Sequence, residues 1–200
     1  MRKLALAFAT LLFSTAALAQ STMGTVTGSA VTPAPTVSAA VPIKDPENTL
    51  LLQLKDGLVV IQMYPNKAPN HVARVKELAR QHFYDGLKFH RVIDGFMAQT
   101  GDPTGTGAGG SGKNINAEFN DMHFIRGTVG AARTSDPNSA DSQFFICFAP
   151  APSLDGQYTI WGQVISGMQY VDNIKKGAPG SGTVSDPDKI VTLRVAADVK

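Results

Sequence analysis

Short apolar runs joined by turn residues constrain the fold of this 200-residue chain more than any other feature. An Asp-Gly pair at positions 56–57 divides the aliphatic and β-branched residues of segment 48–65, and such a pair predicts a β-hairpin. Another Asp-Gly pair, at 94–95, divides segment 87–102 in the same way. The other strand-like runs are residues 127–132, 142–149, 158–165 and 189–199. Together these runs predict roughly eight strands.

Two segments have helical spacing instead. Segment 68–83 carries Pro69 at a position suited to a first helical turn, and segment 167–177 ends at a glycine. Their apolar residues recur on one face: Val72, Val75 and Leu78 or Ala79 in the first segment, and Met168, Val171 and Ile174 in the second. Because strands dominate and turns join most of them, we expect a mainly β domain, an antiparallel barrel closed by a helix at each end.

The first 45 residues differ in character from the rest. Arg2 and Lys3 precede an apolar run too short to span a bilayer, and Ala17-Leu18-Ala19 offers a small-x-small cleavage site. We therefore interpret residues 1–19 as a secretory signal peptide rather than an uncleaved membrane anchor. Residues 20–45 are rich in Ser, Thr, Ala and Pro and predict a flexible linker, so the folded domain is expected at 46–200.

The expected location is the periplasm, with secretion to the medium as the alternative. Removing residues 1–19 leaves 16 Lys and Arg against 16 Asp and Glu, so the mature chain is near neutral. We expect no nucleic-acid partner, no membrane partner after signal cleavage, and a monomer. The single cysteine, Cys147, excludes an internal disulfide and is expected to be a small buried hydrophobe in its apolar run.

Several chemistries lack their signatures. The four histidines, at 71, 82, 90 and 123, have no metal-site spacing, so we expect no metal and no cofactor. The glycine-rich segment 103–112 lacks the pattern of a phosphate-binding loop and is typical of a long mobile loop. No Gly-x-Ser-x-Gly elbow is present, but sequence order does not exclude a Ser-His-Asp triad, so a secreted hydrolase stays an alternative.

The stretch "FHRVIDGFMAQTGDP", residues 89–103, holds one arginine among apolar residues, without a serine or cysteine nucleophile. Here and further along the chain lies a set of donor and apolar side chains: Arg91, Phe96, Met97, Gln99, Gln143, Phe145, Leu154 and Tyr158. Taken singly, the apolar residues favour core positions, the glutamines favour surface or strand-end positions, and the arginine favours a salt bridge at a barrel end. Only the combination favours a binding site.

Two motifs carry a family resemblance. "FHRVIDGFMAQTGD" resembles the signature of the cyclophilin peptidyl-prolyl isomerases, and "SQFFICFA" followed by "LDGQYTIWGQV" is similar to their second signature segment. The order and spacing of the motifs agree over about residues 46–200. The resemblance implies an eight-stranded antiparallel closed barrel capped by two α-helices. It also implies cofactor-free isomerisation of proline-containing polypeptides, such as unfolded or partly folded exported proteins.

The resemblance further implies a role for each matching position. Arg91 matches the catalytic arginine, and Gln99 and Gln143 match the polar groups that hold the arginine and the substrate backbone. The other matching positions are Phe96, Met97, Phe145 and Leu154 as walls of the proline pocket, Ala132, Arg133 and Thr134 as the strand against which the peptide lies, and His90 and Tyr158 as flanking site residues. Many members of the family have asparagine at the position of Arg133 and histidine at that of Tyr158.

One departure from the family pattern concerns drug binding. Many eukaryotic members carry a tryptophan immediately before the "LDG" leucine, and here this residue is Ser153. In the family that tryptophan supports the binding of cyclosporin. Trp161 lies eight residues further on, on the next predicted strand, and does not replace it. We therefore expect weak cyclosporin binding with peptide turnover retained.

The side chains in this set suit a reaction that rotates a bond without breaking one. The barrier to rotation about a peptide bond is about 18–20 kcal/mol because rotation breaks amide resonance. A permanently protonated arginine beside an apolar pocket can donate to the twisted amide, and a glutamine can hold that arginine without neutralising it. The alternative is a chaperone or peptide-binding module that uses the same pocket, with catalysis incidental.

Overall fold

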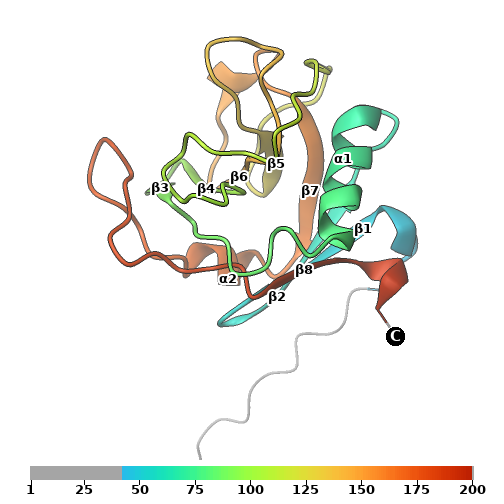
Figure 1. Cartoon of the computed structure of the whole chain (residues 1–200), viewed down its shortest axis with the longest axis horizontal. Helices are drawn as coiled ribbons and strands as arrows, with labels where there is room; N and C mark the ends of the chain where they lie inside the picture. The colour runs from blue at the N-terminus through green and yellow to red at the C-terminus, as the bar shows by residue number, and fades with distance from the viewer. Residues whose placement is uncertain (1–41, 200) are drawn as a thin grey trace, which may run out of the picture. The chain divides into compact units, whose positions relative to one another are not determined.

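The computed structural model describes residues 42–199, which contain one eight-stranded sheet (Figure 1). Each adjacent pair of strands is antiparallel, and their order is β3-β4-β6-β5-β7-β2-β1-β8. The strands are β1 (Thr49–Leu54), β2 (Gly57–Met63), β3 (Arg91–Ile93), β4 (Met97–Thr100), β5 (Thr128–Ala131), β6 (Phe144–Cys147), β7 (Ile160–Ser166) and β8 (Thr192–Val195). The sheet curls into an antiparallel barrel, which confirms the mainly β fold.

Both predicted hairpins form. β1 and β2 pair from Thr49 opposite Gln62 to Leu54 opposite Gly57, so the chain reverses at Lys55-Asp56. β3 and β4 pair around the second Asp-Gly, and this register places Arg91 directly opposite Gln99. The turn residues therefore fix the register of the site strands as well as their existence.

The first helix, α1 (Pro69–Arg80), begins at its proline as predicted and packs against β8 through an apolar face. The second helix, α2 (Met168–Asp172), packs against β2 and is shorter than the predicted segment 167–177. It ends early because the following backbone is used elsewhere: the Lys175 N–H donates to the Asp188 carboxylate, and the Gly177 N–H donates to the Val92 carbonyl. Tertiary hydrogen bonds replace the helical ones there.

The barrel seam lies between β3 and β8, the two ends of the strand order. These strands share no continuous ladder, but isolated antiparallel bridges join Lys88 to Lys189 and Arg91 to Thr183. The N–H of Phe89 also donates to the carbonyl of Asp188 at 2.9 Å. The predicted eight-stranded antiparallel barrel with two helices is thus confirmed, although isolated bridges and not a continuous strand pairing join its two ends, so it is less fully closed than predicted.

The apolar interior has two parts. In the main core, the rings of Tyr84, Phe144 and Trp161 pack edge to face, with centroids 5.6 Å apart in each successive pair. A smaller cluster around Met97 and Phe145 lies beneath partly buried residues. Cys147 belongs to this smaller cluster and is free and buried, as predicted, and burial raises the pKa of its thiol to about 12.

The predicted signal peptide (1–19) and most of the predicted linker (20–45) lie outside the described residues. Within residues 42–199, none of the helices has the length and apolar character needed to cross a membrane.

Candidate active site

A cavity of about 180 Å³, the apolar cavity, opens over the smaller apolar cluster that forms its floor. It is lined by nine residues, all of them among the predicted site positions: Arg91, Phe96, Met97, Gln99, Ala132, Arg133, Phe145, Leu154 and Tyr158. The strand pairing explains how distant parts of the sequence meet there. Arg91 lies opposite Gln99 on β4, and Gln99 lies opposite Phe145 on β6, so these three residues form a row across three strands.

The floor of this cavity is aromatic. The Phe145 ring stacks on Phe124 with centroids 5.7 Å apart and meets the Tyr158 ring edge to face at 5.9 Å. Gly130 lies on β5, opposite Phe145 on β6. The glycine leaves room for the Phe145 ring, because a Cβ at position 130 would lie 2.6 Å from the Phe145 Cζ. A flat hydrophobic floor with rigid walls suits a compact apolar ring such as that of proline.

Arg91 forms no salt bridge with any residue in the described range 42–199, so the alternative of a structural ion pair at the barrel end is not observed. Its Nε donates to the Ser181 carbonyl at 3.2 Å, and its NH1 donates to Gln99 Oε1 at 3.4 Å. Both acceptors are neutral. The guanidinium is therefore oriented while its charge stays uncompensated, and it borders an apolar cavity.

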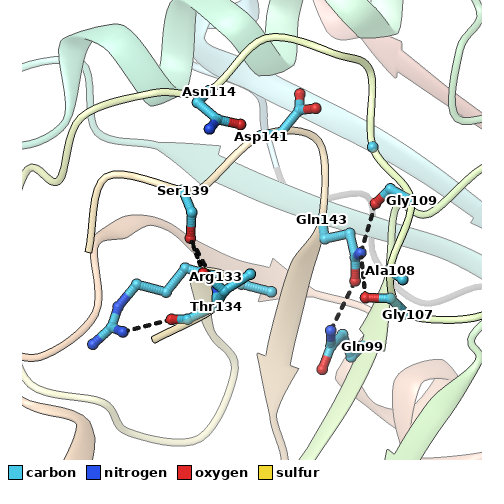
Figure 2. Close-up of a pocket in the computed structure, with 12 residues that line it drawn as sticks. Gln99, Gly107, Ala108, Gly109, Asn114, Arg133, Thr134, Ser139, Asp141 and Gln143 are labelled. Atoms are coloured by element: carbon cyan, nitrogen blue, oxygen red, sulfur yellow. Dashed lines mark hydrogen bonds between the residues drawn. The ribbon is translucent and has the colours of Figure 1, made fainter. Parts of the chain in front are cut away.

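Two side-chain amides, those of Gln99 and Gln143, continue the hydrogen bonding from Arg91, and Figure 2 shows these two amides. Gln99 Nε2 donates to Gln143 Oε1 at 2.8 Å, and Gln143 Nε2 donates to the carbonyls of Gly107 and Gly109 at 3.0 and 2.8 Å. Because Gln143 directs its N–H groups at the loop, its oxygen must face Gln99, and the oxygen of Gln99 then faces Arg91. The glycine loop thus sets the orientation of both side-chain amides.

This loop is tied down by one carboxylate, although its composition is typical of a mobile segment. Asp102, only 1% exposed, accepts from the backbone N–H groups of Thr104, Thr106 and Gly107 at 2.7, 3.0 and 2.6 Å. Burial by itself raises the pKa of Asp102, but these donors and the Thr104 hydroxyl outweigh burial and hold the pKa well below its usual range. Sequence reasoning missed this role, although the Asp-Pro-Thr-Gly sequence of residues 102–105 is a turn signal.

A second, polar cavity of about 270 Å³, whose lining residues are drawn in Figure 2, lies beside the apolar one. Thr134 and Gln143 line it, and it shares Gln99, Ala132 and Arg133 with the apolar cavity. The segment from Ala132 to Thr134 therefore borders both cavities, but β5 ends at Ala131, so these three residues follow the strand instead of belonging to it as predicted.

His90 is the predicted site residue that lines neither cavity. It is buried behind the glycine loop, where a Cβ on Gly107 would lie 3.5 Å from its ring, and neither ring nitrogen has a well-formed hydrogen bond within residues 42–199. Burial lowers the pKa of His90, which favours the neutral ring. Ser153 is exposed next to Leu154, whereas Trp161 is buried in the main core, so this tryptophan does not replace the missing one.

Ser181, whose carbonyl orients Arg91, is a further contact that sequence reasoning missed, because a backbone contact leaves no side-chain signal. No group of three or more His, Cys, Asp or Glu residues is positioned to hold a metal in the described part of the chain.

Comparisons with known proteins agree on one family. Residues 49–195 match the family model described as cyclophilin type peptidyl-prolyl cis-trans isomerase/CLD. A probable peptidyl-prolyl cis-trans isomerase of Brucella suis is 51% identical over 178 residues, which cover 82% of this chain and 89% of the relative. A peptidyl-prolyl cis-trans isomerase of Synechococcus elongatus is 39% identical over 150 residues, covering 74% and 96% of the two chains.

Solved structures show the same relationship. The crystal structure of a cyclophilin from Hirschia baltica has a TM-score of 0.70 and 28% identity, and the match covers 78% of this chain and 76% of that one. A cyclophilin-type isomerase of Cryptosporidium parvum, crystallised in the presence of the dipeptide Ala-Pro, has a TM-score of 0.67 and 28% identity, with 74% and 98% of the two chains covered.

Proposed function

This chain belongs to the cyclophilin-type peptidyl-prolyl cis-trans isomerases, and from that premise we propose that Arg91 is its catalytic donor and the apolar cavity is its proline site. The observation that carries the proposal is an oriented, uncompensated guanidinium at the edge of an apolar cavity. The neighbour crystallised in the presence of Ala-Pro supports a proline-containing ligand for this fold.

The proposed mechanism is preferential binding of the twisted amide. Rotation breaks the resonance of the X–Pro bond, with a barrier of about 18–20 kcal/mol, and the prolyl nitrogen becomes a better hydrogen-bond acceptor as it twists. Arg91 has five N–H donors, of which two are used by Ser181 and Gln99, so three remain for substrate. A donor that bonds the twisted state more strongly than either planar state lowers the barrier without proton transfer.

The activity is tested with a chromogenic Ala-Pro peptide and with a protein whose refolding is limited by proline isomerisation. Uncatalysed isomerisation takes roughly 10–100 s at 25 °C, so acceleration is readily measured. We expect the chain lacking residues 1–19 to accelerate both reactions. If it accelerates neither of them, the proposal is overturned. The same peptide cavity would also serve chaperone activity, but no contact in the site favours binding over turnover.

We also propose that the enzyme acts on exported proteins in the periplasm. The support is the signal-peptide pattern of residues 1–19 followed by the Ser, Thr, Ala and Pro-rich segment. Cell fractionation and determination of the N-terminal residue test this: a chain that begins at Gln20 and is released with periplasmic contents is expected, and a full-length chain in the cytoplasm would contradict it.

The neutral side-chain amide of Gln99, which accepts a hydrogen bond from Arg91, gives one prediction. In Gln99→Glu a carboxylate replaces the amide, so it pairs with the guanidinium and removes the donor to Gln143. We expect kcat/KM for the Ala-Pro peptide to fall roughly tenfold or more, because a paired cation is a weaker donor for the twisted amide. Gln81→Glu, the same change at the end of α1 away from the site, is the control and should keep wild-type turnover.

Cyclosporin binding gives a second prediction. Ser153 is an exposed small residue beside Leu154, so this wall of the cavity lacks the large aromatic surface that a tryptophan would add. We expect calorimetry to give a cyclosporin Kd well above the nanomolar range, and Ser153→Trp to tighten it. Nanomolar binding by the unmodified chain would contradict the prediction.

A further inference from the structure

Arg133 is a second fixed cation, at the boundary between the two cavities. Its guanidinium carbon lies 4.4 Å from the centroid of the Tyr158 ring. Its Nε and NH2 donate to the Gln157 carbonyl at 3.3 and 2.8 Å, and its NH1 donates to the Thr134 carbonyl at 2.8 Å, a contact visible in Figure 2. These partners are neutral, so they hold the group in place without offsetting its charge.

The carboxylates near this boundary are committed to other partners. Asp141, the one carboxylate among the described residues that line either cavity, accepts from the Ser111 hydroxyl and from the backbone N–H groups of Gly112 and Lys113. Asp136, in the loop that follows Arg133, accepts from the N–H of Asn138. No salt bridge to Arg133 forms within residues 42–199. The wall of the apolar cavity thus carries two cations, Arg91 and Arg133, and no carboxylate.

We infer that Arg133 makes this isomerase select proline segments that carry a carboxylate side chain next to, or one residue away from, the proline. This inference rests on the proposed function, since it requires the proline ring to occupy the apolar cavity. A peptide that continues along Ala132–Thr134 toward the polar cavity then passes Arg133 immediately after leaving the proline site. The guanidinium donates four hydrogen bonds, to the carbonyls of Gln157, Thr134 and, at 3.5 Å, Ser135, so at least one of its five N–H groups, on NH2, remains for a substrate carboxylate.

The expected effect is moderate because Arg133 is only partly buried. Pairs of this kind contribute up to about 1 kcal/mol, which corresponds to about a two- to fivefold preference for a glutamate over a glutamine peptide. A lysine at the same position should be disfavoured by a similar factor, since like charges repel. The preference should shrink as salt is added, because exposed charges are screened.

The experiment uses three peptides that differ at one position only, with Glu, Gln or Lys, and scans the two residues on each side of proline. Exchange NMR, which needs no coupled protease, gives kcat/KM for each peptide. The quantity compared is the ratio of kcat/KM between two peptides measured with the same enzyme variant. The wild-type chain should prefer Glu over Gln over Lys at one or more positions. Arg133→Gln should bring the Glu-to-Gln ratio close to one, and Arg133→Lys, which keeps the charge, should retain part of it.

The outcomes separate this inference from the function on which it rests. If no peptide is turned over, the proposed function fails. If all peptides are turned over equally by the wild-type chain at every scanned position, the function stands and the inference is overturned. If Arg133→Gln lowers the turnover of every peptide by the same factor and leaves the ratios intact, Arg133 merely supports the Tyr158 wall, and the inference is overturned as well.

Discussion

Arg91→Ala is expected to fold like the wild-type chain and to lose X–Pro turnover by roughly 10²–10³-fold in kcat/KM, the loss typical of removing one fixed transition-state donor. The arginine side chain is exposed, and within residues 42–199 it donates two hydrogen bonds and forms no salt bridge. β3 is held by its own backbone pairing with β4 and by the Val92 N–H that donates to the Gly182 carbonyl. Fold and activity therefore separate at this position.

Two further variants sharpen the Arg91 experiment. Arg91→Lys keeps the positive charge but loses the planar fork, so it should recover only part of the activity. Arg80→Ala removes the last arginine of α1, which forms salt bridges with Glu47 and Asp198, and should leave turnover unchanged. Circular dichroism confirms folding in each case, and near wild-type turnover by a folded Arg91→Ala would rule out Arg91 as the catalytic donor.

The same variant separates isomerase from chaperone activity. If Arg91→Ala still suppresses aggregation of a client while losing X–Pro turnover, the apolar cavity binds segments independently of catalysis. Loss of both would show that one event underlies them.

Those parts of the fold that depend on local signals were predictable from the sequence. The Asp-Gly turns gave the β1–β2 and β3–β4 hairpins, and Pro69 gave the start of α1. All nine residues that line the apolar cavity were identified, because seven of them lie within the two motifs and the other two, Ala132 and Arg133, lie in a segment whose order and spacing match the family. The convergence of Arg91, Gln99 and Phe145 follows from hairpin register and antiparallel pairing.

The features that depend on tertiary partners were not predictable. α2 ends at Asp172 because Asp188 and Val92 take the following N–H groups, and no local signal marks that competition. The glycine loop has the composition of a mobile segment, yet the Asp102 carboxylate accepts hydrogen bonds from three of its backbone N–H groups. Gln99 and Gln143 together match the polar groups that hold the arginine and the substrate backbone, and the sequence did not show that Gln143 bonds the loop through its amide N–H groups and reaches the arginine through Gln99.

Phe144→Ala should lower the free energy of unfolding by about 3–5 kcal/mol, the usual cost of emptying a large buried aromatic site. Phe144 is 1% exposed and lies between Tyr84 and Trp161, with both ring centroids 5.6 Å away. These neighbours belong to strands and loops that cannot close on the cavity without breaking strand pairing. In a domain of this size the loss corresponds to roughly 6–20 °C in Tm.

Phe119→Ala provides the matched control, because it removes the same atoms from a residue that is 44% exposed. The free energy of unfolding of this variant should stay within about 0.5 kcal/mol of the wild-type value. Trp161 is the single tryptophan, so urea unfolding of both variants can be followed by its fluorescence. Equal midpoints for the two variants would mean that the edge-to-face packing of Tyr84, Phe144 and Trp161 contributes little to the stability of the barrel. Phe144 and Phe145 are adjacent on β6, and they point from opposite faces of the strand into the main core and toward the apolar cavity. Equal midpoints would therefore mean that backbone pairing, and not the packing of Phe144, holds β6 and its cavity residue Phe145 in place.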